Sequence, residues 1–224
     1  MKIKLILGLC LAALGLPAQT MTNSYSVTPG LLLPDNNANG YSTTFTVNLE
    51  NSITDISVAL DITGGFNGDL YTYLVSPTGQ MAVLLNRVGR SGSSAYGYSN
   101  TGFDITLATG STQGNVHNYQ NLGANYNLDG QLTGTWTADG RNLDPRSSGS
   151  LFSGTSPTLG LDNYIGADPY GVWTFFIADL SPGGQSTLQG ITLNIMTVPE
   201  PQTWVMLGGG MAVFCLCRSW RFRR

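Results

Sequence analysis

Three residues occur in an order that could form a catalytic triad: Asp61, His117 and Ser156. In a triad the histidine takes a proton from the serine hydroxyl while a carboxylate orients the histidine. Ser156 is followed by Pro157 in a Gly- and Ser-rich stretch, and no α/β pattern brings three such distant residues together. A lone histidine among Asn and Tyr residues is typical of a loop or surface position. We therefore expect no enzyme.

Asp69 and Asp179 are the candidates for binding a metal ion. Calcium takes carboxylate and carbonyl oxygens, and Gly and Asn residues surround both aspartates. Alternatively, both side chains cap turns by accepting hydrogen bonds from backbone N–H groups. No histidine pair or His-Glu-x-x-His run offers a zinc site. Calcium is thus the single cofactor that the residues suggest.

The N-terminus has the pattern of a secretory signal peptide. Lys2 and Lys4 precede an apolar run from Leu5 to Leu16, and we expect cleavage after Ala18. The run is shorter than the roughly 20 apolar residues of an ordinary spanning helix. Residues 1–18 are therefore predicted to direct export and to be removed.

The C-terminal residues 198–224 form a three-part pattern. Pro199, Glu200 and Pro201 come first, and an apolar segment, residues 203–217, follows. The chain closes on membrane-stop arginines: Arg218, Arg221, Arg223 and Arg224. Such a charged end follows the positive-inside pattern, with the body of the protein outside. We expect a hydrophobic helix that acts either as a membrane anchor or as a transient sorting stop.

The middle of the chain is acidic and lacks cysteine. From Gln19 to Val198 there are eleven Asp and one Glu against four Arg and no Lys, a net charge of −8. This charge argues against a nucleic-acid partner. All three cysteines lie in the terminal segments, so no disulfide stabilises the middle. Residues 19–197 are enough for one domain with its own core.

Short strands and turns dominate this domain. Apolar residues alternate with polar ones in several runs, and Gly- and Pro-rich turns separate them. The candidate strands are residues 41–49, 53–62, 70–76, 81–85, 103–107, 172–178 and 188–195. This spacing predicts an all-β fold, an antiparallel β-sandwich or jelly roll. Between Thr109 and Leu159 the pattern weakens, and we expect an ordered excursion held by Tyr119, Trp136 and Leu143.

Two blocks of sequence resemble a known domain. Residues 68–79 read Gly-Asp-Leu-Tyr-Thr-Tyr-Leu-Val-Ser-Pro-Thr-Gly, and residues 171–179 read Gly-Val-Trp-Thr-Phe-Phe-Ile-Ala-Asp. They are similar to the Gly-Asp-Leu strand, Ser-Pro-x-Gly turn and Gly-x-Trp-Thr strand of the P domain in kexin- and furin-type proprotein convertases. The resemblance implies a P-domain-like sandwich without a protease domain. Trp173, Phe175 and Ile177 alternate and are expected to face its core.

The tail resembles a second family, the PEP-CTERM sorting signals that exosortase-type membrane proteases handle. Val198-Pro199-Glu200-Pro201, the apolar run and the final arginines stand in that family's order. The resemblance implies an exosortase-type partner, cleavage of the tail and release toward the extracellular matrix. The alternative is an ordinary linker and anchor.

Two functions follow. The first is a non-catalytic protein of the cell envelope or surface, whose P-like domain stabilises or binds extracellular material such as polysaccharide. The alternative is a glycan-binding or glycan-hydrolysing secreted protein, with exposed Tyr96, Tyr98, Tyr119 and Tyr126 stacking on sugars. Hydrolysis needs two carboxylates at a defined separation, and the sequence identifies no such pair.

Overall fold

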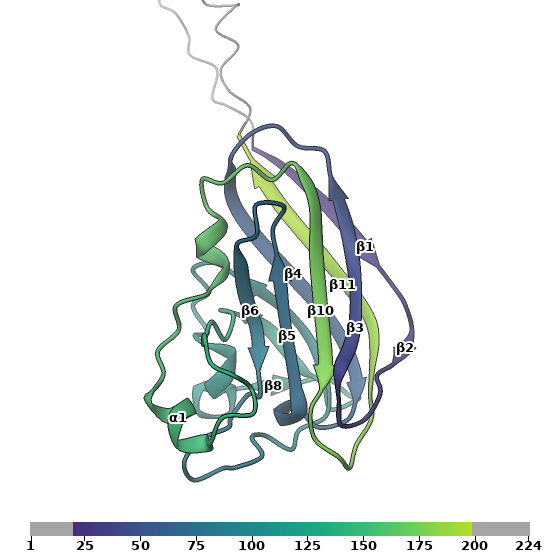
Figure 1. The fold of residues 1–224 in the computed structure, drawn as a ribbon, viewed down its shortest axis with the longest axis vertical. Coiled ribbons are helices and arrows are strands. Elements are labelled where there is room, and N and C mark those ends of the chain that lie inside the picture. The colour runs from purple at the N-terminus through teal and green to yellow at the C-terminus, as the bar shows by residue number, and fades with distance from the viewer. Residues whose placement is uncertain (1–19, 199–224) are drawn as a thin grey trace, which may run out of the picture. The chain divides into compact units, whose positions relative to one another are not determined.

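The computed structural model describes residues 20–198, which fold into two β-sheets packed face to face (Figure 1). The strands are β1 (Met21–Val27), β2 (Leu31–Leu32), β3 (Asn37–Val47), β4 (Ile53–Gly64), β5 (Leu70–Val75), β6 (Met81–Asn86), β7 (Phe103–Ala108), β8 (Asn125–Tyr126), β9 (Leu132–Trp136), β10 (Gly171–Asp179) and β11 (Ser186–Thr197). The helices are short: η1 (Asn67–Asp69), η2 (Val116–Leu122), α1 (Gly149–Gly154) and η3 (Leu161–Tyr164). The predicted all-β sandwich is confirmed.

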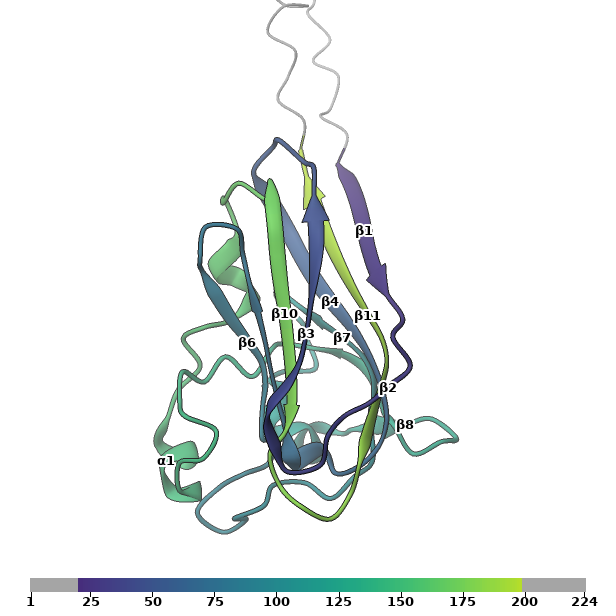
Figure 2. The same ribbon diagram turned by 45° about the vertical axis from the view of Figure 1, so that its right-hand side comes forward.

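The larger sheet has the strand order β1-β11-β4-β7-β9-β8, with β2 also paired to β11, and the smaller sheet has the order β3-β10-β5-β6. Figure 2 shows the two layers side by side. All pairs are antiparallel except β7 and β9, which run parallel with Phe103 opposite Leu132. Parallel neighbours need a crossover of a dozen residues or more, and the long segment between these strands provides it.

The core lies between the sheets and follows the two-residue period of the strands. On β10 the side chains of Trp173, Phe175 and Ile177 are fully buried, whereas Val172 is 52% exposed. The Trp173 indole N–H donates to the Pro169 carbonyl at 2.8 Å, and the Tyr164 ring packs edge-on against the indole. The predicted core face of this strand is therefore confirmed.

The excursion from Thr109 to Leu159 is ordered and packs against the sandwich. It contains η2, β8, β9 and α1. Tyr119 and Trp136 are fully buried with their rings in contact, as predicted, and Leu143 is partly buried. Two aromatic side chains thus hold a segment that the strand pattern alone does not organise.

Both ends of the described domain lie at one end of the sandwich (Figure 1). Met21, which opens β1, pairs with Thr197, which closes β11. The opposite end carries the loops that join β4 to β5, β6 to β7 and β10 to β11, and we call it the distal end. The predicted signal peptide and C-terminal hydrophobic helix lie outside the described residues. Within residues 20–198, no helix is long and apolar enough to cross a membrane.

Candidate functional site

The distal end brings together the two predicted cation ligands, Asp69 and Asp179. Asp69 closes η1 just before β5, and Asp179 is the last residue of β10. These strands pair with Asp179 opposite Leu70, and the Leu180 amide donates to the Asp69 carbonyl at 2.9 Å. Asp69 and Asp179, which are 110 positions apart in the sequence, therefore meet where β5 begins and β10 ends.

Arg87 bonds to one of these aspartates and to a neighbour of the other. Its Nη2 lies 3.3 Å from Asp69 Oδ1 and also donates to Ser181 Oγ, and its Nε donates to the Gly68 carbonyl at 2.9 Å. The Ser181 amide in turn donates to Asp179 Oδ1 at 3.3 Å. We call Asp69, Arg87, Asp179 and Ser181 the distal cluster. All four are nearly inaccessible to solvent.

The backbone of Arg87 adopts an unusual conformation to make these contacts. Its φ is 49°, in the left-handed region that residues with a Cβ rarely occupy. The Arg87 amide donates to the Leu70 carbonyl at 2.9 Å, so both its backbone and its guanidinium are fixed against the start of β5. Such strain persists only where the surroundings impose it. The position of Arg87 is therefore set by the fold.

The distal cluster carries more negative than positive charge. Burial raises the pKa of Asp179 from 3.8 to about 6, and burial also raises the pKa of Asp69 although Arg87 opposes this. Burial likewise lowers the pKa of the Arg87 guanidinium. Asp179 Oδ2 is buried without a hydrogen-bond partner. With two carboxylates and one guanidinium, the cluster has excess negative charge unless a proton or a further cation neutralises it.

Calcium remains a prediction for this cluster. The ion takes six to eight oxygen ligands, whereas Arg87 already contacts one oxygen of Asp69. Among residues 20–198, no group of three or more His, Cys, Asp or Glu side chains could hold a metal ion. Asp179 Oδ1 accepts a bond from the backbone two residues on, as the turn-cap alternative expects.

A hollow of about 220 Å³ opens beside the cluster and is lined by aromatic and polar residues. Its lining includes Phe66, Tyr96 and Tyr98, together with Asp69 and Ser181. Tyr96 is 76% exposed and Tyr126, elsewhere, is also exposed, as the sugar-stacking alternative requires, whereas Tyr98 is only partly exposed and packs against the core. Tyr119 is buried, so its predicted exposure was wrong: its ring packs against Trp136 and its hydroxyl bonds to Asn67 and Asn100.

The three residues of the rejected triad do not bond to one another. Asp61 accepts a hydrogen bond from Gln131 on the larger sheet, and Ser156 is exposed. Both ring nitrogens of His117 are engaged, one by Asp139 at 2.6 Å and the other by the Arg90 carbonyl at 3.0 Å. His117 therefore has no free nitrogen to act as a base toward a serine.

The expectation that His117 is a loop or surface residue was wrong, because it belongs to a buried polar network. Asp139 accepts from the His117 ring, from Arg141 Nη1 at 3.1 Å and from the Asn86 amide at 3.2 Å. Asn86 lies on β6, so the network fastens the excursion to the smaller sheet. Sequence reasoning missed it, because isolated polar residues in a glycine-rich stretch resemble a solvated loop.

The predicted sorting residues lie outside the described residues. They are Pro199, Glu200, Pro201, Arg218, Arg221, Arg223 and Arg224. Their role stays a prediction.

Comparison with known families shows what part of this domain is similar to. Residues 53–153 match the family model of the proprotein convertase P-domain. This part of the chain resembles a P-domain. The match runs from β4 through α1 and includes Asp69 and Arg87, while Asp179 and the rest of β10 lie beyond it.

Two solved structures of an Aeromonas sobria serine protease are similar to this chain. In the complex with the chaperone ORF2, the TM-score is 0.44 at 13% identity, covering 81% of this chain and 27% of that chain. In the second, the TM-score is 0.42 at 11% identity, covering 80% and 27% respectively. This chain therefore spans about a quarter of the length of those proteins. No match to a curated protein was found.

Proposed function

We propose that this chain is an exported, non-catalytic surface protein that displays its P-domain at the cell envelope. The proposal rests on the P-domain match and on the fact that Asp61 and His117 bond to residues other than each other and Ser156. The P-domain stabilises or binds extracellular material. An exosortase-type membrane protease acts on the C-terminal tail and releases the domain toward the extracellular matrix.

The arrangement of the two ends of the domain carries this proposal. Met21 and Thr197 pair at one end, so the segments before Thr20 and after Val198 are both covalently attached there. The distal end, with its hollow and Tyr96, lies at the other end of the strands. The distal loops therefore lie at the end of the domain opposite the points where these segments join it.

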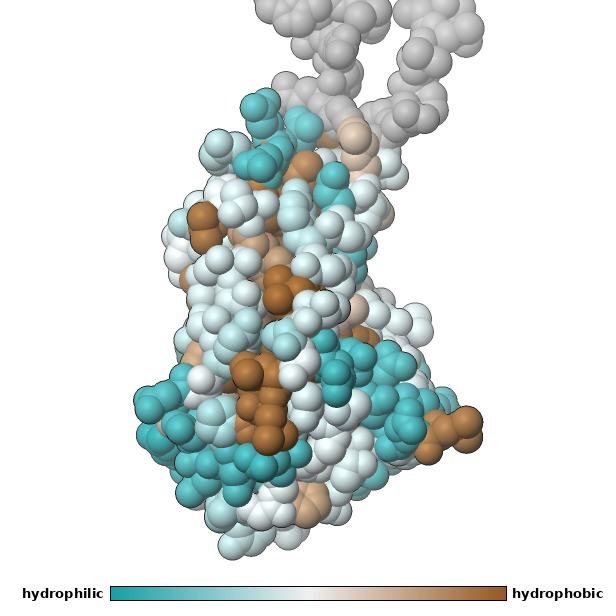
Figure 3. Space-filling model, turned by 90° about the vertical axis from the view of Figure 1, so that its right-hand side faces the viewer, coloured by the Kyte–Doolittle hydropathy of each residue, from teal (hydrophilic) through white to brown (hydrophobic). Residues whose placement is uncertain are grey.

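The surface agrees with a domain that works in water. On the face drawn in Figure 3, hydrophobic side chains form separate patches among hydrophilic and neutral ones. The exposed large hydrophobic residues, such as Leu32 and Leu128, come from different segments of the chain. Scattered residues of this kind are normal on a soluble surface. That face therefore favours a displayed domain over one buried against a large apolar partner.

Changing Pro199-Glu200-Pro201 to Ala-Ala-Ala tests the sorting role of the tail. We expect a longer, membrane-retained precursor, because two prolines around one carboxylate keep the segment extended for a protease. Gln202→Ala, next to the motif, is the matched control and should be processed normally. The measurement is chain length in membrane and released fractions by immunoblot. Normal processing of the triple variant would refute the sorting role.

The proposal also includes a calcium ion at the distal cluster. The open acceptor Asp179 Oδ2 and the excess of carboxylates support it, while Arg87 competes for Asp69. Glycan binding is the second candidate function. It is supported by a separate polar hollow on the larger sheet, described next.

A further inference from the structure

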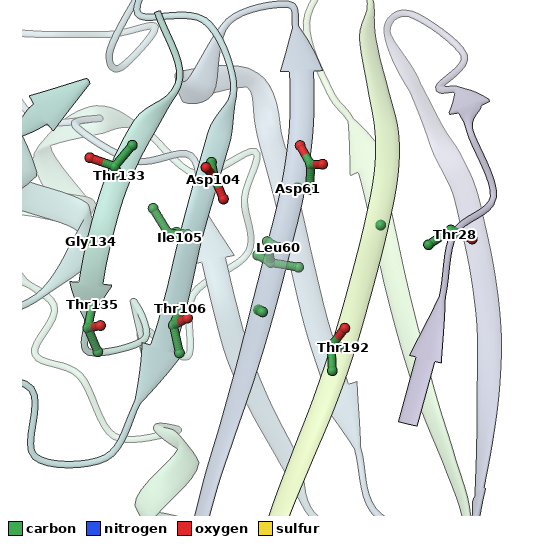
Figure 4. A pocket seen from close by; sticks show the side chains of 12 residues that line it. Thr28, Leu60, Asp61, Asp104, Ile105, Thr106, Thr133, Gly134, Thr135 and Thr192 are labelled. Carbon is green, nitrogen blue, oxygen red and sulfur yellow. The ribbon is translucent and has the colours of Figure 1, made fainter. Parts of the chain in front are cut away.

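The outer face of the larger sheet carries a hollow of about 560 Å³ lined by short polar side chains (Figure 4). The side chains stand in two rows across four strands. Successive partners in the first row are Thr133, Asp104, Asp61 and Gly190. Successive partners in the second row are Thr135, Thr106, Ala59 and Thr192. The volume falls in the range of about 300 to 1,000 Å³ that is typical of ligand sites.

The alternation of the strands produces this face. Leu60, Ile105 and Ile191 are buried in the core, so their neighbours along each strand point outward. Those outward residues are Thr, Asp, Ala and Gly, and none of them is long enough to cover the sheet. Each threonine hydroxyl can both donate and accept a hydrogen bond. Thr133 already donates to the Asn125 carbonyl at 3.2 Å and Thr192 bonds to Ser26 at 2.9 Å, so each of these two keeps one role for a ligand. The face therefore offers a regular grid of partners to a molecule rich in hydroxyl groups.

The two carboxylates of the first row face each other. Asp61 on β4 is directly opposite Asp104 on β7, and like charges in this position destabilise a sheet. Gln131 Nε2 donates to Asp61 Oδ1 at 2.9 Å. None of the four arginines among residues 20–198 lines the hollow. A ligand that brings positive charge would relieve the repulsion.

A bare metal ion fits this pair poorly. Calcium takes six to eight oxygens, and the part of the chain that the structure describes holds no metal-ligating group of three or more acidic, His or Cys side chains. A neutral glycan would satisfy the hydroxyl rows and leave the facing carboxylates unpaired. A cationic peptide would pair the carboxylates but brings few hydroxyl groups to the threonine rows. A ligand that matches both the threonine rows and the facing carboxylates carries hydroxyl groups and positive charges together.

We propose that this hollow binds a glycan with protonated amino groups, such as a partly deacetylated amino-sugar polymer. The ammonium groups lie between Asp61 and Asp104, and the sugar hydroxyls bond to Thr106, Thr133 and Thr135. The inference rests on the proposed binding role of the P-domain and is independent of how the tail is sorted.

Cosedimentation of the full chain, purified in mild detergent, tests the ligand class. The probes are beads of chitosan, of fully acetylated chitin and of cellulose. We expect retention on chitosan only, and release by about 1 M salt, which screens exposed charges. Equal retention on cellulose or chitin, or no retention on chitosan, would overturn the proposal. Tail processing is scored separately by immunoblot, so failure of the sorting proposal cannot be confused with failure of this one.

Substitutions in the hollow test the assigned residues. The double variant Asp61→Asn, Asp104→Asn should bind chitosan oligosaccharide about fivefold more weakly, the scale expected for two exposed charge pairs. The double variant Asp129→Asn, Asp162→Asn makes the same charge change at two exposed positions outside the hollow and should bind normally. Thr106→Val keeps the β-branched shape, removes one hydroxyl, and should weaken binding without changing its salt dependence.

Thermal melting gives a second readout on the same proteins. The double variant should melt at or above the temperature of the original protein, because facing like charges are removed. Chitosan oligosaccharide should raise the melting temperature of the original protein more than that of the double variant. Unchanged chitosan binding by the folded double variant would contradict the assignment of the two carboxylates.

Discussion

Replacing Asp179 with Asn should make the stability of the domain less dependent on pH. The Asp179 side chain is fully buried, one of its oxygens has no hydrogen-bond partner, and burial raises its pKa from 3.8 to about 6. One pKa unit corresponds to about 1.4 kcal/mol, so ionised Asp179 costs the folded state about 3 kcal/mol. Asn keeps the acceptor for the Ser181 amide and never ionises.

The direction of the effect follows because the pKa of Asp179 is higher in the folded state than in the unfolded state. The protonated carboxyl contributes stability that is fully present below about pH 3.8 and is lost as the pH rises through about 6. The original protein should therefore lose up to about 3 kcal/mol across this window through Asp179. Asp179→Asn should match it near the acid end and exceed it near neutral pH.

Urea unfolding followed by tryptophan fluorescence, in the presence of chelator, measures this difference at a series of pH values. Asp35→Asn, an exposed carboxylate near the same cluster, is the control and should retain most of the pH dependence. A constant difference between Asp179→Asn and the original protein across the series would refute the reasoning, because it would mean that Asp179 does not titrate in this window.

Two further predictions use the same preparation. If calcium binds Asp69 and Asp179, millimolar calcium should raise the melting temperature relative to chelator, and magnesium should raise it less. Asp179→Asn should abolish the calcium-dependent shift. The same melting temperature with calcium, magnesium and chelator would leave both residues as turn caps. Trp173→Ala should lower the free energy of unfolding by about 3 to 5 kcal/mol, because the indole is fully buried in the core, and a loss below about 1 kcal/mol would contradict that packing.

The strands of the core could be predicted because their side chains alternate. All seven predicted strands are present, with ends within a few residues of those expected. The edge strand β1, by contrast, reads Met-Thr-Asn-Ser-Tyr-Ser-Val and has few apolar residues. Its stability comes from pairing with β11 along its whole length. A partner far along the chain leaves no local signal. Strand β9, Leu-Thr-Gly-Thr-Trp, was missed because its three middle residues are polar or glycine.

The candidate site was only partly predictable. Asp69 and Asp179 stood out because each lies at a strand-turn junction inside one of the two P-domain-like blocks, and the fold brings them together. The role of Arg87 could not be seen, because its contacts depend on a left-handed backbone and on Ser181, far along the chain. The facing of Asp61 and Asp104 is likewise a matter of register between β4 and β7.

The masses and terminal peptides of the mature protein, isolated from its native cells, test the central claim most directly. The account predicts a protein from the envelope or the medium that begins at Gln19 and lacks the arginine-rich end of the tail. A cytoplasmic protein that begins at Met1 and retains Arg224 would contradict the account of an exported, sorted P-domain.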